Sequence, residues 1–404
     1  MTHIPHNDQY DNVHRVFSAL SGAGPLFAIQ YPDKYSVPVE ILRKEAKTMS
    51  RFRVIEFQLL QACNASCVYC AYDQNLPEFN KWLPLEIVEK TLAEEKPEWV
   101  WFEGGEVTMT DRSKNYLLQA MEIAGRYGVK NRINTNCRNI DQQWARRLAE
   151  GGLQFACVSF DTLVPERLEF LRGFPEGTGA ENLERLKRNA LFLADQGITV
   201  DLEATVTRHN IHELEALYDY AQSVATDGRN IIMGAQCLVA TYDEVFGLYP
   251  DMEEMIDVFM RLTRKARNGR IPVRICCSPM VRCKYPELYE PHPNIIWVEC
   301  TCGFDYVHVN ATGDVLLCGF WDHSETIGNL NTASLREIWE HSGLRRQALS
   351  ETPEQCEGCR HWEGPARCHN SCFSIARRKT GSFKSFAYDL TTRAIADAAN
   401  GRQS

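Results

Sequence analysis

The sequence predicts an α/β fold in which a parallel sheet curls into a partial barrel of six strand–helix units, followed by a small cysteine-rich domain. From about residue 53 to 268, strand-like apolar runs alternate with segments of helical periodicity. Parallel strands joined by helical crossovers have this pattern and curl readily into barrels. After Arg270 the periodicity weakens, and ten of the 16 cysteines lie between Cys276 and Cys372. A small domain organised by metal ions fits this second region.

The elements follow one another in a regular order along the chain. The expected strands are the apolar runs at 53–59, 99–102, 131–135, 155–161, 199–206 and 230–235. The expected helices are the periodic segments at 85–95, 115–127, 141–150, 180–196, 211–223 and 252–267. In the first of these helices Ile87, Val88 and Leu92 fall on one side, and Gly197 ends the fourth. We expect an N-terminal extension at 1–50, a barrel domain at 51–269 and the cysteine-rich domain at 270–404.

Composition and charge limit the classes of function. The hydrophobic and charged fractions, 44% and 24%, are those of an ordinary globular protein. A formal net charge of −9 argues against binding to nucleic acid or to an anionic membrane, which would need a basic surface. The first ten residues lack the basic start and apolar run of a signal peptide, and there is no stretch of 18 apolar residues. We therefore expect a cytoplasmic protein that does not cross a membrane.

In a reducing compartment, clustered cysteines usually bind metal rather than form disulfides. Cys63, Cys67 and Cys70 follow the first expected strand and have no fourth cysteine nearby. Three thiolates can hold an iron–sulfur cluster and leave one iron open, which is the mark of a catalytic site. Zinc with a remote fourth ligand is the alternative. Isolated cysteines such as Cys137 and Cys157 are expected to pack in the sheet.

The second expected strand ends in Gly104, Gly105 and Glu106. Two glycines let the backbone approach a ligand closely. The carboxylate of Glu106 can accept charge-assisted hydrogen bonds from an ammonium group. Alone this segment would indicate only a tight turn, but its place one strand–helix unit after the cysteines favours a shared binding site.

The C-x3-C-x2-C motif and the Gly-Gly-Glu segment resemble the signatures of the radical S-adenosylmethionine superfamily. The resemblance covers residues 53 to about 240. It implies that the open iron binds the methionine part of S-adenosylmethionine, whose reductive cleavage yields a 5′-deoxyadenosyl radical that abstracts hydrogen from a substrate. It also implies that Tyr69 packs beside the adenine. Arg172-Gly173 matches another recurring segment of this superfamily.

Polar residues at the ends of the third, fourth and fifth strands resemble the superfamily's positions for the ribose hydroxyls and the methionine carboxylate. They are Asn134, Asn136, Ser159, Asp161, Thr205, Thr207 and Arg208. The alternative for each is a polar residue that caps a turn or a helix at a strand end.

The cysteine-rich tail resembles the SPASM extension of the same superfamily, which carries one or two auxiliary [4Fe–4S] clusters. Cys302, Gly313 and Cys318 fit C-x9–15-G-x4-C, and further cysteines follow at Cys356, Cys359, Cys368 and Cys372. The resemblance implies a first cluster on Cys302, Cys318, Cys372 and one upstream cysteine. That ligand is Cys276, Cys277, Cys283 or Cys300, and we favour Cys283.

The second auxiliary cluster would use Cys356, Cys359 and Cys368, with no obvious fourth thiolate. The tail departs from the SPASM pattern here, because the interval after Cys359 is longer than usual and no cysteine follows Cys372. The second cluster therefore has a non-cysteine ligand, has an open iron or is absent. A structural zinc site is the alternative for the tail as a whole.

Auxiliary clusters can accept the electron left on a substrate radical, so the resemblance implies a net oxidation such as dehydrogenation or cross-link formation. Some relatives, the sulfatase-maturing enzymes, carry a basic aspartate after the cysteine of G-x4-C, where this chain has Gly319. The substrate is expected to be a ribosomal peptide, which we favour slightly, or a small molecule such as an aminosugar or cyclitol. A flavodoxin or ferredoxin is the expected electron donor.

Two other functions stay open from the sequence. A radical epimerase would need a cysteine that returns a hydrogen atom, and Cys237 is the candidate because it follows the sixth expected strand and should face the cavity. Alternatively, the chain is not an enzyme but an iron–sulfur electron carrier or a zinc-binding module. Neither of these needs the Gly-Gly-Glu segment.

Overall fold

The computed structural model describes residues 52–71, 80–226, 228–240, 242–298, 300–359 and 372–399. The expected N-terminal extension at 1–50 lies outside these residues. No helix in the described part combines the length and the apolar character needed to cross a membrane.

One sheet contains the eleven strands of the described residues, in the order β11-β10-β9-β1-β2-β3-β4-β5-β6-β7-β8. Its parallel strands β1 to β8 are Val54–Leu60, Trp99–Gly104, Lys130–Thr135, Leu153–Ser159, Thr199–Val206, Ile231–Cys237, Val273–Cys276 and Ile295–Val298. Strand β9 (Tyr306–Val309) pairs parallel with β1. Strands β10 (Asp314–Leu316) and β11 (Gly328–Asn329) extend that edge in antiparallel register.

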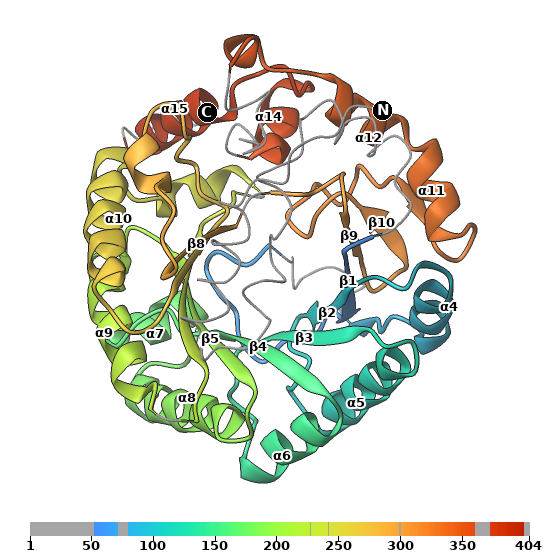
Figure 1. Cartoon of the computed structure of the whole chain (residues 1–404), viewed down its shortest axis with the longest axis vertical. Coiled ribbons are helices and arrows are strands. Elements are labelled where there is room, and N and C mark those ends of the chain that lie inside the picture. The colour runs from blue at the N-terminus through green and yellow to red at the C-terminus, as the bar shows by residue number, and fades with distance from the viewer. Residues whose placement is uncertain are drawn as a thin grey trace, which may run out of the picture.

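Helices cover the convex side of the curved sheet. In Figure 1 the strands form an open ring, and α4, α5, α6, α8 and α10 lie outside it. Helices α4 to α10 are Leu85–Glu95, Asp111–Arg126, Gln142–Glu150, Pro165–Arg172, Gly179–Ala194, Leu214–Val224 and Met252–Arg267. The C-terminal helices α11, α12, α14 and α15 are Leu335–His341, Gly343–Ser350, Phe373–Thr380 and Ala387–Ala399. Short 3₁₀ turns η2 to η5 occupy Ile211–Glu213, Asp243–Leu248, Pro286–Tyr289 and Glu354–Cys356.

The two faces of the sheet differ in polarity. Along β5 the apolar Leu202, Ala204 and Val206 alternate with the polar Asp201 and Glu203, so the two sets point to opposite faces. The apolar set packs in the core under the helices, and the polar set lines the inside of the barrel. The interior therefore has a layer of buried charged and polar groups.

The fold class predicted from the sequence is confirmed, and the six expected strands correspond to β1–β6. Helix α7 was not expected, because it is only two turns long and follows a loop. Strands β7 and β8, also missed, are four-residue runs too short to show a period. Both continue the parallel sheet beyond residue 270, so the sheet has no break at the expected domain boundary of 269/270. That boundary stays a prediction about domain organisation.

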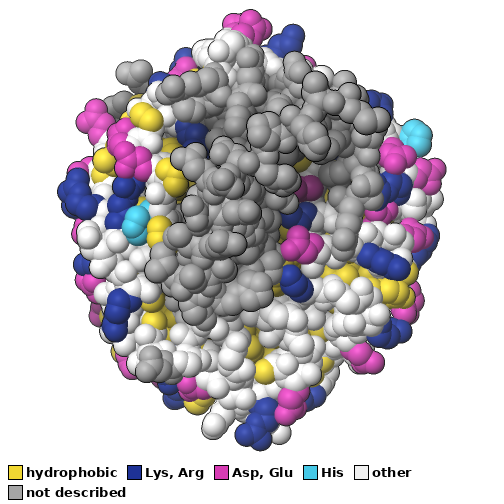
Figure 2. All heavy atoms as spheres, in the orientation of Figure 1, with side chains coloured by type: hydrophobic (Ala, Val, Ile, Leu, Met, Phe, Trp, Pro, Cys, Tyr) yellow, Lys and Arg dark blue, Asp and Glu magenta, His cyan; other side chains and the backbone are white. Residues whose placement is uncertain are grey.

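The described surface carries no extended basic area on the face shown in Figure 2, where Lys and Arg side chains are interspersed with Asp and Glu. This mixture agrees with the acidic balance of the chain.

Candidate active site at the carboxyl ends of the strands

The loop after β1 holds Cys63, Cys67 and Cys70, which are half-buried and form no disulfide. Its backbone is fixed to the end of α7, since Ser66 N donates to Arg172 O at 3.0 Å and Val68 N donates to Leu171 O at 3.1 Å. Gly173, which follows Arg172 at the end of α7, has φ +61, and an added Cβ there would lie 2.4 Å from Ser66 O. Only glycine permits this close approach, so the loop is docked tightly on α7.

Gly104 and Gly105 bring the end of β2 against the chain just before Cys63. An added Cβ would lie 2.0 Å from Leu60 O at Gly104 and 2.1 Å from Ala62 O at Gly105. Gly105 N donates to Leu60 O at 2.8 Å, and Glu106 N donates to Ala62 O at 2.9 Å. The glycines therefore allow close contact with the start of the cysteine loop. The close approach to a ligand that the sequence predicts for these glycines stays a prediction.

Glu106 is buried and its carboxyl group is fixed from both sides. Oε1 accepts hydrogen bonds from Thr108 N (2.9 Å), Thr108 Oγ1 (2.6 Å) and Thr135 Oγ1 (2.8 Å), whereas Oε2 accepts one from Asn136 N (2.5 Å). Burial raises the pKa of Glu106, and these hydrogen bonds oppose that shift. The charge of Glu106 also contributes to the raised pKa of Cys63, which places the carboxyl group near the cysteine loop. Oε2 accepts fewer of these hydrogen bonds than Oε1.

Asp161 joins Tyr69 to Arg172. Its Oδ2 accepts hydrogen bonds from Tyr69 Oη at 2.5 Å and from Arg172 Nε at 2.6 Å, and its Oδ1 accepts one from Thr205 N at 2.9 Å. Arg172 also directs a guanidinium nitrogen to Cys67 Sγ at 3.6 Å. Burial raises the pKa of Tyr69, which therefore stays a phenol. Asp161, expected to bind the cofactor, thus positions Tyr69 and a cation beside the loop.

The other predicted cofactor contacts fall into two groups. Asn136 Nδ2 donates to Asn64 Oδ1 in the cysteine loop at 2.7 Å, so it lies at the site. Asn134 donates to Glu103 Oε2 at 2.9 Å inside the barrel, and Ser159 is in register with Glu203 there. These two side chains lie on strands that border the site.

Thr207 and Arg208 are placed differently. Thr207 uses its backbone and hydroxyl to bond Asn210 Oδ1, which is the turn-capping alternative. Arg208 is exposed and donates to Gly247 O at 3.2 Å. None of the contacts in the described residues connects either of them to the cysteine loop.

Cys237 faces away from the barrel interior. It is the register partner of Val206, which lies on the apolar, helix-facing side of the sheet. Its side chain has 0% exposure and packs in the core, and burial raises the pKa of its thiol well above the usual value. The expectation that Cys237 faces the cavity is therefore wrong, because the alternation of β6 directs the preceding Gln236 inward instead.

The cysteines of the tail form one compact group from distant segments. The thiol of Cys302 contacts those of Cys300 and Cys318, and these contacts, together with burial, raise the pKa of Cys302. Cys372 is half-buried. Desolvation by the surrounding protein, followed by the charges of Cys318 and Cys300, raises the pKa of its thiol to about 12. The thiol of Cys277 contacts that of Cys276. This contact, burial and the nearby thiols of Cys372 and Cys300 raise the pKa of Cys277. The structure thus brings together Cys300, Cys302, Cys318 and Cys372, with Cys277 next to them.

Cys283 lies elsewhere. It is exposed, and the pKa of its thiol is raised by desolvation and by the nearby thiol of Cys359. Cys283, the upstream cysteine that we favoured as the fourth ligand, therefore lies apart from this group, whereas Cys300, another of the four candidates, lies within it. Cys359 N donates to Cys356 O at 3.1 Å, so these two cysteines share a turn. Cys368 lies outside the described residues.

Two family models match the chain in the regions just described. The Radical SAM superfamily model matches residues 57–221, which hold the cysteine loop and the Gly-Gly-Glu segment. The SPASM model, an iron–sulfur cluster-binding domain, matches residues 300–361. This chain is a radical SAM enzyme with a C-terminal SPASM-type domain.

Among curated proteins, this radical SAM enzyme is similar to the AdoMet-dependent heme synthase of Oleidesulfovibrio alaskensis, with 25% identity over 79% of this chain and 81% of that protein. It is also similar to the Fe-coproporphyrin III synthase of Methanosarcina barkeri, with 23% identity over 76% of this chain and 80% of that protein.

Solved structures share its fold. Streptococcus suis SuiB bound to precursor peptide SuiA aligns with TM-score 0.63 and 18% identity, covering 95% of this chain and 88% of that chain. Native anSMEcpe with bound AdoMet aligns with TM-score 0.62 and 16% identity, covering 86% of this chain and 96% of that chain.

The radical SAM cofactors are S-adenosylmethionine, a [4Fe–4S] cluster that cleaves it and auxiliary clusters in the SPASM-type domain. The donor set of the loop fits the first cluster, because Cys63, Cys67 and Cys70 form no disulfide and lie close enough for the charges of Cys67 and Cys70 to act on Cys63. The tail group fits an auxiliary cluster through four neighbouring thiols. Bound at the loop, the first cluster would supply reductive cleavage of S-adenosylmethionine. Tyr69, Glu106 and Asn136 are the predicted contacts that would hold this cofactor, because they lie at or beside the loop.

Proposed function

We propose that this radical SAM enzyme removes hydrogen from an unactivated carbon of its substrate and completes a net oxidation, by dehydrogenation or cross-link formation. The observation that carries the proposal is the second thiol group of Cys300, Cys302, Cys318 and Cys372. Strand β9 pairs directly with β1, and Cys302 and Cys318 lie close to the ends of β9 and β10. An electron acceptor there would be built into the sheet that carries the cleavage site.

We further propose a ribosomal peptide or a small natural product as the substrate, with a flavodoxin or ferredoxin as electron donor. The peptide is supported by the fold shared with SuiB, which is solved in complex with a precursor peptide. A second candidate is a porphyrin. It is supported by the heme synthase and Fe-coproporphyrin III synthase relatives, which match along most of their length. The epimerase alternative loses its hydrogen donor, because Cys237 faces the helices.

The test uses the anaerobically reconstituted full chain with dithionite and S-adenosylmethionine. It is incubated in parallel with a precursor peptide encoded beside its gene and with iron coproporphyrin III. The proposal expects 5′-deoxyadenosine to form together with a product that has lost hydrogen from one of the two. A product that has the mass of the substrate in ordinary water, but carries one deuterium when the reaction is run in heavy water, would show an epimerase and contradict the net oxidation.

A further inference from the structure

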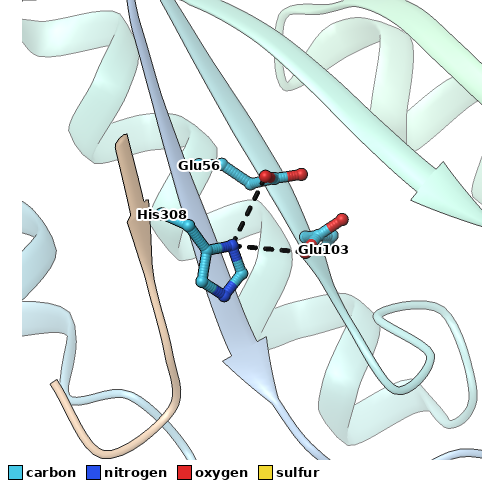
Figure 3. Close-up of side chains that lie close together, drawn as sticks. All are labelled: Glu56, Glu103 and His308. Carbon is cyan, nitrogen blue, oxygen red and sulfur yellow. Dashed lines mark hydrogen bonds and ion pairs between the residues drawn. The ribbon is translucent and has the colours of Figure 1, made fainter. Parts of the chain in front are cut away.

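Three ionisable side chains from neighbouring strands meet inside the barrel: Glu56 of β1, Glu103 of β2 and His308 of β9. Figure 3 shows the imidazole Nδ1 facing both carboxyl groups. Nδ1 lies 3.4 Å from Glu56 Oε2 and 3.6 Å from Glu103 Oε1. Glu56 and His308 are register partners with 4% and 0% exposure. The fold therefore builds this group from adjacent strands, with Glu103 partly exposed at 13% of its side chain.

The spacing of these atoms suits one metal ion. The ligand atoms of all three residues lie within 4.8 Å of one another. In a tetrahedral site with metal–ligand bonds of about 2.1 Å, neighbouring ligand atoms are about 3.4 Å apart. The distances from Nδ1 are close to that value and long for good hydrogen bonds. Imidazole and carboxylate groups are common ligands of divalent zinc, iron and manganese.

Gly319 leaves the site open on one side. An ideal Cβ on this residue would lie 3.3 Å from His308 Nδ1 and 3.5 Å from both Glu103 Oε1 and Glu56 Oε2. The three atoms therefore converge on a point beside Gly319. Because glycine has no side chain, a fourth ligand can approach an ion from that direction.

Two neighbours support a ligand at this place. Asn134 holds Glu103 Oε2 at 2.9 Å, which leaves Oε1 directed to the group, as a residue behind a metal ligand commonly does. Gln58, the register partner of Glu103, has 0% exposure, and its Nε2 atom has no hydrogen-bond partner among the described residues. An oxygen bound to an ion beside Glu103 would accept a hydrogen bond from this orphaned donor.

We propose that Glu56, Glu103 and His308 bind a divalent transition-metal ion whose open position beside Gly319 takes water or an oxygen atom of the substrate. This site uses no thiol and is distinct from the iron–sulfur clusters. A second interior group, Cys157, Asp201 and Glu203, is different, because Arg274 forms ion pairs with both of its carboxylates. The paired guanidinium offsets part of the carboxylate charge of that second group and occupies oxygens that a metal ion would need.

The experiment titrates Mn²⁺ into the holoenzyme with its clusters oxidised and follows free Mn²⁺ by electron paramagnetic resonance. Mn²⁺ prefers oxygen and nitrogen ligands and avoids the cysteine sites. We expect about one bound ion per chain, as the single site implies. Glu103→Gln removes a charged ligand, and Gly319→Ala leaves all three ligands but places a methyl group at the open side. Each should weaken binding at least about tenfold.

Gly125→Ala is the matched control, since beyond its chain neighbours and the backbone of its own helix no atom lies within 4 Å of the added Cβ. It should bind Mn²⁺ as the wild-type chain does. Iron content and circular dichroism check that each variant folds and keeps its clusters. If Glu103→Gln does not fold, the Mn²⁺ affinity of Gly319→Ala alone tests the proposal. Wild-type protein without a stoichiometric Mn²⁺ site, or equal affinity in wild type and Gly319→Ala, would overturn the proposal.

Discussion

The cysteine loop after β1 and the cysteine group of the SPASM-type domain bind the same kind of cofactor but are built differently. Cys63, Cys67 and Cys70 lie within one short loop, fixed by the backbone of α7 and by the end of β2. The tail group takes its thiols from Cys300 to Cys372, segments that only the tertiary structure brings together. The members of a local ligand set can be identified from their spacing in the sequence. The members of a set assembled from distant segments can be identified only from the folded structure.

The largest effect is expected when the three cysteines of the loop after β1 are removed. Replacing Cys63, Cys67 and Cys70 together by alanine should abolish cleavage of S-adenosylmethionine, because no other thiol of the described chain shares the loop. The tail should keep its iron. Measurement of 5′-deoxyadenosine by mass spectrometry, with iron analysis, checks both halves. Cys137→Ala, a change at a core cysteine with 0% exposure, is the control that should still cleave. Continued cleavage by the triple variant would show that the loop is not the site.

The next largest effect is expected in the cysteine group of the SPASM-type domain. Cys300→Ala should cost the first auxiliary cluster most of its iron or convert it to a three-iron form, because it removes one of four neighbouring thiolates. Cys283→Ala should leave that cluster intact, since Cys283 lies with Cys359. Iron analysis and Mössbauer spectra compare the two. The sequence also predicts a second auxiliary cluster, and hence about twelve irons per chain. The opposite ranking of the two variants would restore the ligand assignment made from the sequence.

The ligands of the cysteine loop could be predicted from the sequence, whereas the fourth member of the tail group could not. Strands β1–β6 and the cysteine loop follow from apolar runs and short spacings, which are local properties of the chain. Cys300 was one of four upstream candidates, and spacing could not rank them, because contact between Cys300, Cys318 and Cys372 depends on the packing of separate segments. The face of Cys237 was missed for a related reason: one residue of register reverses the direction of a side chain in a strand.

A third prediction tests how the loop is held. Arg172 and Asp161 form an ion pair with 8% and 0% side-chain exposure. Arg172→Met leaves a buried carboxylate without its cation, which should cost about 3–5 kcal/mol of stability. Thermal unfolding at matched cluster content measures this loss. The exposed pair of Arg185 and Glu181 gives the comparison, because Arg185→Met should cost less than about 1 kcal/mol. Similar losses in both variants would mean that Arg172 does not anchor the loop.

The smallest effect concerns Glu106. Glu106→Gln keeps an acceptor oxygen but removes the charge, which should lower affinity for S-adenosylmethionine about tenfold. Thr108→Val removes a donor from the opposite oxygen, Oε1, and keeps the charge, so it should change affinity less. Equilibrium binding to the cluster-loaded protein measures both. Unchanged affinity in Glu106→Gln with the cluster intact would place Glu106 outside the cofactor site.

The most direct test of the central claim is the electron paramagnetic resonance spectrum of the dithionite-reduced protein, recorded with and without S-adenosylmethionine. The cluster on Cys63, Cys67 and Cys70 is expected to have an open iron, whereas the tail cluster has four thiols available. We predict that the cofactor changes one cluster signal only, and that this signal is missing from the triple alanine variant while the tail signals persist. A spectrum that the cofactor leaves unchanged, or a cofactor-dependent change that survives in the triple variant, would contradict the account.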